Sequence, residues 1–275
     1  MSNVQELEKK AIELRKTALT MIHQAQSGHP GGSLSAADIV TALYFNEMNV
    51  DPKNPNWEDR DRFILSKGHV CPILYSALAM KGYFPMEEIK TLRKYGSILQ
   101  GHPDMKKCPG VDISTGSLGQ GLSCGVGMAI VGKREEKTYR VFAVVGDGEC
   151  NEGQIWEAAQ SAAKYELDNL VIFVDNNGLQ NDGPCEEIMP TLNLREKFAA
   201  FGFEAYRING HNMQQIVDVL NQVREEKNGK PKAIVCDTVK GRGVSFMENV
   251  VSWHGIAPND EEYKLAMEEV EGGLK

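Results

Sequence analysis

The chain has 275 residues, of which 41% are hydrophobic and 25% are charged, and its formal net charge is −8 at pH 7. These values are ordinary for a globular protein with a sizeable core, and the acidic excess argues against a nucleic-acid-binding surface. No apolar run has membrane length and no apolar signal core follows the N-terminus, so we expect a cytoplasmic protein with neither nucleic-acid nor membrane partners.

The first half of the chain predicts helices separated by polar and glycine-rich loops. Apolar residues recur every three or four positions in the first helix, which the cluster Ser27–Gly32 ends. One short apolar run, residues 62–65, predicts a strand that follows a polar loop at 51–61. The expected helices are 4–26, a helix that Ser33 or Ser35 caps and that runs through Tyr44, 72–81, 86–94 and 119–133.

The second half alternates strands and helices regularly, which is typical of βαβ units. The expected strands are 141–145, 170–175, 204–208 and 233–238, and the expected helices are 153–165, 193–200, 212–227 and 260–271. This pattern predicts an α/β fold with a parallel β-sheet flanked by helices on both faces. Because no repeat or linker interrupts it, we expect a single domain over residues 1–275.

The unusual loops each follow a predicted strand, and in parallel sheets such loops meet at one edge, where ligands bind. These loops are 66–69, 146–152, 175–182, 209–211 and 239–243.

The first chemical signal is the acidic turn Gly146-Asp147-Gly148, with Glu149 and Glu152 close behind it. A bare carboxylate repels a phosphate, so Asp147 needs a bound cation, and Mg²⁺ prefers carboxylate or amide oxygens together with phosphate oxygens. Asn177 lies one βαβ unit further on, at the end of the next strand. The sequence therefore favours a metal–diphosphate site over a helix cap formed by Asp147 alone.

The second signal is a set of four histidines beside glycines in loops: His29, His69, His102 and His254. Their ordinary pKa near neutrality suits proton transfer at carbonyl and hydroxyl oxygens. A zinc site is the alternative, but zinc ligands usually include two that are close in sequence, and these four are far apart.

The six cysteines, by contrast, are scattered without a C-x-x-C pair, so we expect reduced thiols that act mostly as small core residues. Cys150 lies in the acidic turn, and we interpret it as structural.

Taken together, these motifs resemble the thiamine diphosphate enzymes, and over nearly the whole chain they are similar to the N-terminal, diphosphate-binding domain of transketolases. The resemblance depends on the turn at Gly146–Gly148 with Asn177, and on further motifs in the same order. Those motifs are Ser27–Gly31, Asp59–Phe63, Leu65–His69, Gly101–Pro103, Thr115–Gly121, Lys240–Gly243 and Ser252–Gly255. It implies the thiamine diphosphate-binding fold of the diphosphate (PP) type.

The resemblance also implies roles for the histidines. His29 and His69 resemble the pair near the reactive carbon of the cofactor, and His102 resembles the histidine that recognises the donor sugar. His254 resembles one that approaches the diphosphate and the reacting centre. Glu152, with Glu157, resembles a carboxylate of the subunit contact that communicates with the cofactor.

For the cofactor, the resemblance implies thiamine diphosphate with Mg²⁺, or with Ca²⁺ or Mn²⁺ in its place. The metal ligands are Asp147, Asn177 and the backbone carbonyl of Leu179. The implied cofactor contacts are His69, Gly116, Ser117, Leu118, Gly146, Asp147, Gly148, Glu149, Asn177, Asn181, Lys240 and His254. At Ser117 many members carry proline, and several microbial members carry apolar residues at Asn181 and Lys240.

The family's pyrimidine-binding domain, which supplies the activating glutamate, does not follow within these 275 residues. We therefore expect a split enzyme, active only with a separate C-terminal subunit in an α₂β₂ assembly. The implied reaction is the transfer of a two-carbon ketol unit from a ketose phosphate, such as xylulose 5-phosphate, to an aldose phosphate, such as ribose 5-phosphate, in the pentose phosphate pathway.

Four alternatives stay open at this point. Two are other thiamine diphosphate enzymes: a deoxyxylulose-phosphate synthase and the α subunit of a 2-oxo-acid dehydrogenase. The third is a nucleotide-dependent oxidoreductase, although the chain has no G-x-G-x-x-G motif in the required context. The fourth is a non-catalytic cofactor-binding module.

Overall fold

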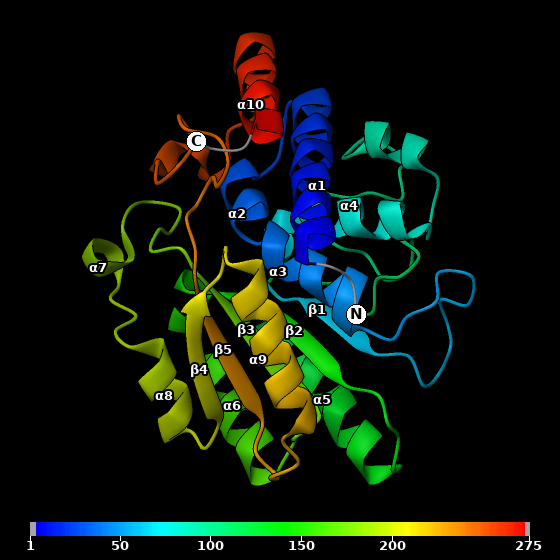
Figure 1. The fold of residues 1–275 in the computed structure, drawn as a ribbon, viewed down its shortest axis with the longest axis vertical. Coiled ribbons are helices and arrows are strands. Elements are labelled where there is room, and N and C mark those ends of the chain that lie inside the picture. Colours follow the sequence, from blue (N-terminus) through cyan, green and yellow to red (C-terminus); the bar gives the residue numbers. More distant parts are fainter. Residues whose placement is uncertain (1–3, 273–275) are drawn as a thin grey trace.

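A five-stranded, entirely parallel sheet lies at the centre of the protein (Figure 1). The computed structural model describes residues 4–272. Within that range the strands lie in the order β1-β2-β3-β5-β4. They are β1 (Arg62–Leu65), β2 (Val141–Gly146), β3 (Leu170–Asn176), β4 (Glu204–Asn209) and β5 (Lys232–Asp237). The predicted α/β class and all five predicted strands are confirmed.

Helices cover both faces of the sheet, as the alternation of the sequence predicts. In Figure 1, α9 lies in front of the sheet and α5 and α6 lie behind it. The helices are α1 (Val4–Ala25), α2 (Pro30–Ser35), α3 (Ala37–Ala42), α4 (Cys71–Lys81), α5 (Gln120–Arg134), α6 (Gly153–Lys164), α7 (Cys185–Ile188), α8 (Leu194–Ala200), α9 (Met213–Glu225) and α10 (Asp260–Gly272).

The two faces of the sheet bury alternate residues of the same strands, because successive side chains of a strand point in opposite directions. In β2, Phe142 and Val144 pack into the core beneath α1, α3, α4 and α9. Their neighbours Val141, Ala143 and Val145 pack into the core beneath α5, α6 and α8. Since both faces are covered, every residue of β2 is apolar or glycine and buried.

Local signals account for where several helices begin and end. The Asn193 and Asn212 side chains accept hydrogen bonds from the first-turn amides of α8 and α9, at 3.3 and 3.0 Å. Pro72 lies at the start of α4, where its missing N–H is no loss, and Gly82 ends that helix in the left-handed conformation at φ 91°.

The predicted helix from Ser33 or Ser35 is wrong in its start. The chain turns helical at Pro30 and continues through α2 and α3 into a π-helical turn at Leu43–Glu47. Proline is well suited to a first helical position, and the two glycines after it allow close packing. A Cβ at Gly31 would lie 2.9 Å from Cγ of Lys240, and one at Gly32 would lie 2.6 Å from Val70.

Three other local differences are small. The predicted helix at 86–94 is a 3₁₀ helix over Met86–Thr91. Sequence patterns did not predict α7 or the 3₁₀ turn Val251–His254, because both are about one turn long. Among the described residues, no helix is long and apolar enough to cross a membrane.

Candidate active site

The loops that follow the strands meet at the carboxyl edge of the sheet, as predicted. Gly146 at the end of β2 pairs with Asp175 of β3, so the acidic turn and the Asn177 loop start side by side. The buried Asp147 carboxylate accepts hydrogen bonds from the backbone amides of Gly148 at 2.7 Å and Gly178 at 2.5 Å. Burial and the neighbouring Asp175 raise the pKa of Asp147. A cation bound to this carboxylate would offset both the cost of burying its charge and the repulsion from Asp175.

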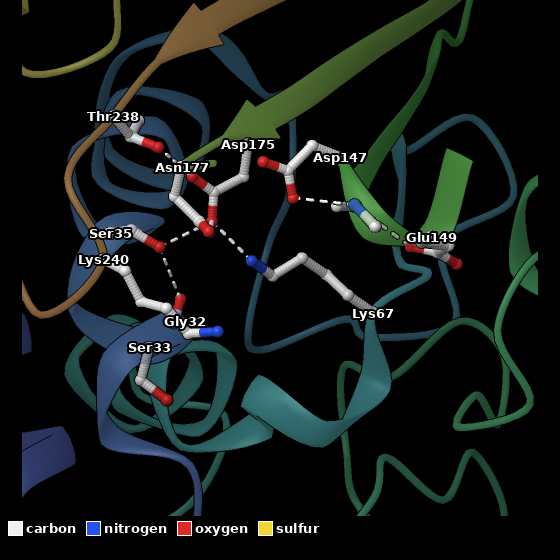
Figure 2. Close-up of polar contacts among 12 residues, drawn as sticks. Gly32, Ser33, Ser35, Lys67, Asp147, Glu149, Asp175, Asn177, Thr238 and Lys240 are labelled. Carbon is white, nitrogen blue, oxygen red and sulfur yellow. Dashed lines mark hydrogen bonds and ion pairs between the residues drawn. The ribbon is translucent and has the colours of Figure 1, made fainter. Parts of the chain in front are cut away.

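Asp175, for which the sequence patterns indicate no role, is fully buried and lies beside Asp147 (Figure 2). Its carboxylate accepts hydrogen bonds from Ser35, Thr238 and the ammonium of Lys67, which is also buried. Burial acts to raise the pKa of Asp175, but the charge of Lys67 and these donors hold it below its ordinary value. Asp175 also accepts a 3.4 Å hydrogen bond from the Asn177 amide, which orients that side chain.

The oxygen atoms expected to bind the metal lie in this one region. The side-chain oxygen of Asn177 accepts a hydrogen bond from the amide of Leu179 at 3.1 Å, which closes the loop into a tight turn. The Leu179 carbonyl accepts a hydrogen bond from the Lys240 ammonium at 3.1 Å and keeps a second lone pair. One carboxylate, one amide and one carbonyl oxygen suit a Mg²⁺ ion that also binds phosphate oxygens.

Lys240 connects this region to the histidines. Its ammonium is buried and lies 2.7 Å from Nδ1 of His254. Because an ammonium can only donate, His254 accepts with Nδ1 and carries its proton on Nε2. Burial and the charge of Lys67 lower the pKa of Lys240 to about 8. Lys240 therefore provides a cation that contacts both the expected metal loop and the histidine cluster.

His29, His69 and His254 form one cluster, with ring centroids 5.0 to 5.5 Å apart. Burial, followed by the charge of Arg93, lowers the pKa of His29 to about 4, and burial with the charge of Lys240 lowers that of His254 to about 3. Burial and Lys67 also lower the pKa of His69. All three rings are therefore neutral at pH 7 and can both donate and accept a proton.

One buried ring nitrogen of the cluster lacks a hydrogen-bond partner among the described residues. This nitrogen is Nδ1 of His29. Buried polar atoms are normally paired, so an unpaired one beside a cluster of neutral imidazoles indicates a ligand position. The residues present therefore fit a diphosphate cofactor with a divalent cation at one end and a reacting centre at the other.

His102 lies next to this cluster on the loop that contains Gly116. A Cβ at Gly116 would lie 2.7 Å from Cδ2 of His102, and one at Gly68 would lie 2.8 Å from the Gly116 amide. Only glycines allow these segments to approach so closely. Ser117 is exposed and Leu118 is half-buried on the same loop.

Two of the carboxylates differ in their environments. Glu149 is buried, and its carboxylate accepts hydrogen bonds from Ser66 and from the amides of Gly119 and Gly146, the latter two at 2.9 and 3.0 Å. Because its oxygens bond to three separate segments of the chain, the side chain holds these segments together at the site. Glu152 is exposed at the start of α6, where it is free to face another subunit.

Asn181 lies at the rim of the site, exposed and hydrogen-bonded to Asp182 at 2.8 Å. Cys150 is buried and its pKa is raised well above the ordinary value, mainly by burial, which agrees with a structural role. All six cysteines are free thiols, and Cys124 is the exposed one. Among the described residues, no group of three His, Cys, Asp or Glu side chains could hold a metal ion, so the expected cation depends on the mixed oxygen set above.

Four residues of the site were not predicted from the sequence: Ser35, Lys67, Asp175 and Thr238. Lys67 lies within the motif Leu65–His69, and Asp175 lies near the end of β3. The available signal was Asp175, a charged residue near the end of an apolar strand. A charge that is buried needs a partner, so this residue could have indicated a buried ion pair.

Comparison with known proteins places these features in a family. Residues 7–271 match the family described as "Transketolase, thiamine diphosphate binding domain". The chain is 44% identical over 266 residues to a 6-deoxy-6-sulfo-D-fructose transketolase subunit of Clostridium sp. (strain MSTE9), covering 97% of this chain and 96% of that one. It is 42% identical over 267 residues to an apulose-4-phosphate transketolase subunit of Phocaeicola vulgatus, covering 97% of this chain and 94% of that one.

Longer relatives match this chain over less than half of their own length. The chain is 40% identical to human transketolase over 256 residues, which are 92% of this chain and 40% of the human protein. Among solved structures, the transketolase of Campylobacter jejuni superposes with a TM-score of 0.92 at 33% identity, covering 98% of this chain and 43% of that chain. The chain thus spans less than half the length of the solved relative.

Proposed function

The chain belongs to the transketolase thiamine diphosphate-binding domain family, and on that premise we propose that it is the diphosphate-binding subunit of a two-chain transketolase. The single observation that carries the proposal is the joining of an oxygen-rich turn to a cluster of neutral histidines. The turn contains Asp147, Asn177 and Leu179, and Lys240 connects it to His254.

In this proposal, Asp147, Asn177 and the Leu179 carbonyl hold a divalent cation, Mg²⁺ in the first instance, that binds the diphosphate. Gly146 and Gly148 allow the backbone to approach the cofactor, and the loop at Gly116–Leu118 contacts its other end. When bound, thiamine diphosphate would supply a nucleophilic carbon for a ketone and an electron sink for the adjacent carbon–carbon bond that breaks. The neutral rings of His29 and His69 then donate protons to substrate oxygens and accept them, and His102 recognises the donor sugar.

We also propose that a separate pyrimidine-domain subunit completes the site, in an α₂β₂ assembly. Two relatives that match this chain over 94–96% of their own length are named as subunits. The exposed Glu152 and Glu157 at the start of α6 are the residues that we assign to that contact.

The substrates that we propose are a ketose phosphate donor such as xylulose 5-phosphate and an aldose phosphate acceptor such as ribose 5-phosphate. The two relatives are named for 6-deoxy-6-sulfo-D-fructose and apulose 4-phosphate, so related sugars belong in the same assay. With ribose 5-phosphate as the acceptor, a donor panel with the reconstituted pair of subunits would include the other three sugars and pyruvate. Pyruvate as the preferred donor would instead support one of the other two thiamine diphosphate enzymes, a deoxyxylulose-phosphate synthase or a 2-oxo-acid dehydrogenase.

The metal site is tested with Asp147→Asn and a matched control, Asp182→Asn, in the same group of loops. We expect Asp147→Asn to lose Mg²⁺-dependent cofactor binding, because the negative charge is lost and a weaker amide oxygen replaces the carboxylate. Asp182 is exposed, and its side chain accepts a hydrogen bond from the neighbouring Asn181, so its variant should bind normally. Equal affinities for the two variants would contradict the proposed metal site, and full transferase activity of this chain alone would contradict the two-subunit proposal.

A further inference from the structure

His211 lies outside the site just described, in the turn between β4 and α9, yet both of its ring nitrogens form hydrogen bonds. Nδ1 lies 2.8 Å from Oδ2 of Asp38, and Nε2 lies 2.8 Å from the backbone nitrogen of Val239. The ring is only 9% exposed. A nearly buried histidine with two partners from distant segments holds those segments in a fixed relation.

The identity of these partners determines where the ring proton is. The Val239 amide can only donate, so Nε2 of His211 has to be an unprotonated acceptor. The ring proton is then on Nδ1, where it is donated to the Asp38 carboxylate. An imidazolium would place an N–H group against the Val239 N–H, and the bond would be lost. The arrangement therefore selects one neutral tautomer, in the way that a carboxylate fixes the tautomer of a catalytic or metal-binding histidine.

The Asp38 end of this arrangement is firmly held. Arg15 of α1 binds the Asp38 carboxylate through two nitrogens, at 3.1 and 2.5 Å, and donates a third hydrogen bond to the Leu34 carbonyl at 3.2 Å. Both side chains of the pair are buried. His211 is thus attached to the packed core formed by α1 and α3.

The Val239 end leads directly into the active site. Thr238, on one side of Val239, donates to the Asp175 carboxylate. Lys240, on the other side, contacts the Leu179 carbonyl and His254. Two other bonds hold the loop further on, Gly241 N to Gly31 O and Asn249 N to Lys240 O, each at 2.9 Å. Nearer the site, the Thr238 amide donates to the Asn176 carbonyl at 3.2 Å, and the Val239 carbonyl accepts from the Arg242 amide at 3.1 Å. The His211 bond holds the Val239 amide, between the two residues that contact the site.

We propose that His211 is a positioning residue of the diphosphate site: it holds Val239 so that Thr238 and Lys240 keep their places beside Asp175 and Leu179. What the site binds rests on the proposed function, but the fixing of the loop does not. His211 itself touches neither the expected metal ligands nor the cluster of His29, His69 and His254.

The test uses His211→Ala, which removes both bonds, and His211→Gln, whose amide oxygen can still accept from Val239. The matched control is His23→Ala, because His23 also lies 2.8 Å from an aspartate, Asp260, at the contact of α1 and α10. Hydrogen exchange of the 237–243 segment is measured on the full chain without cofactor. Affinity for thiamine diphosphate with Mg²⁺ is then measured by tryptophan fluorescence on the chain combined with its partner subunit.

We expect His211→Ala to speed exchange at residues 239–241 about tenfold, the effect of losing one well-formed hydrogen bond. Cofactor affinity should fall by a similar factor. His211→Gln should recover much of both losses, and His23→Ala should change neither. A ¹⁵N ring spectrum of the unmodified protein, which needs no variant, should show the His211 proton on Nδ1.

Unchanged exchange at 239–241 in His211→Ala, or an equal change in His23→Ala, would overturn the proposal. So would a proton on Nε2 of His211, or faster exchange with unaltered cofactor affinity. If the unmodified complex binds no thiamine diphosphate while the exchange results stand, the proposed function fails and the fixing of the loop by His211 remains.

Discussion

Replacing Arg15 with methionine should destabilise the protein strongly, because Asp38 would lose its buried counter-ion. Although burial acts to raise the pKa of Asp38, Arg15 and His211 bring it from 3.8 down to about 2. At about 1.4 kcal/mol per pKa unit, that difference corresponds to about 2 kcal/mol of stability at neutral pH. The Leu34 carbonyl also loses its Arg15 donor, which costs about 1 kcal/mol or more. We expect a loss of about 3–5 kcal/mol, the usual range for breaking a buried pair.

The loss in Arg15→Met should depend on pH. In the unmodified protein the folded pKa of Asp38 lies below its unfolded value, so its ionised form stabilises the fold above about pH 4. That contribution disappears as the pH falls from 4 towards 2. Without Arg15, burial should raise the folded pKa of Asp38 above its ordinary value. The buried charge then lowers the free energy of unfolding of the variant at neutral pH, and that loss becomes smaller as the carboxylate takes up a proton. The stability difference should therefore shrink between pH 7.5 and pH 4.

Urea unfolding, followed by circular dichroism at both pH values, measures these differences. The matched control is Lys16→Met, one residue further along α1, where a partly exposed ammonium lies 2.6 Å from Glu271. A surface pair of this kind contributes at most about 1 kcal/mol. The double variant Arg15→Met/Asp38→Asn should recover part of the lost stability. Equal losses for Arg15→Met and Lys16→Met, or a loss independent of pH, would refute the reasoning.

Four further outcomes are expected. Asp147→Ala should weaken Mg²⁺-dependent binding of thiamine diphosphate at least about 100-fold in calorimetric titration; an affinity within a few-fold of normal would argue against a metal ligand. Gly31→Ala should lower the free energy of unfolding by about 1–3 kcal/mol, because the new methyl would lie 2.9 Å from Lys240 Cγ and Trp253 O. Gly127→Ala in α5, where nothing lies within 4 Å, should be neutral or stabilising, by up to about 1 kcal/mol. Addition of EDTA should abolish any rise in melting temperature that thiamine diphosphate produces, and a rise that survives chelation would show binding without a metal.

Much of the fold could be predicted because it depends on repeating backbone geometry. The alternation of buried residues in β2 and the spacing of apolar residues in α1 and α9 follow directly from the strand and helix periods. Parallel strands also bring the loops that follow them to one edge, so the meeting of the Asp147 and Asn177 segments followed from their spacing. Elements of about one turn, such as α7, carry too few residues to show a period.

Some residues of the candidate site could also be predicted from the sequence, and others could not. Asp147 and the four loop histidines could be recognised from the sequence, because each has glycine beside it. Glycine is the residue that allows the backbone to approach a ligand or another segment closely. The partners of Asp175 are not visible, since Ser35, Lys67 and Thr238 come from three distant segments. Their meeting depends on strand register and on which rotamers the packed core permits.

By itself, the sequence determined the α/β class, the two covered faces of the sheet and the edge where the chemistry gathers, since all of these follow from local periods and from the rules of parallel sheets. Only the tertiary structure decided that Lys67 neutralises Asp175, that His29, His69 and His254 form one cluster and that His211 reaches the amide of Val239. Hydrogen bonds and ion pairs act over about 3 Å, a distance that only the folded arrangement brings within reach of residues so far apart in the chain.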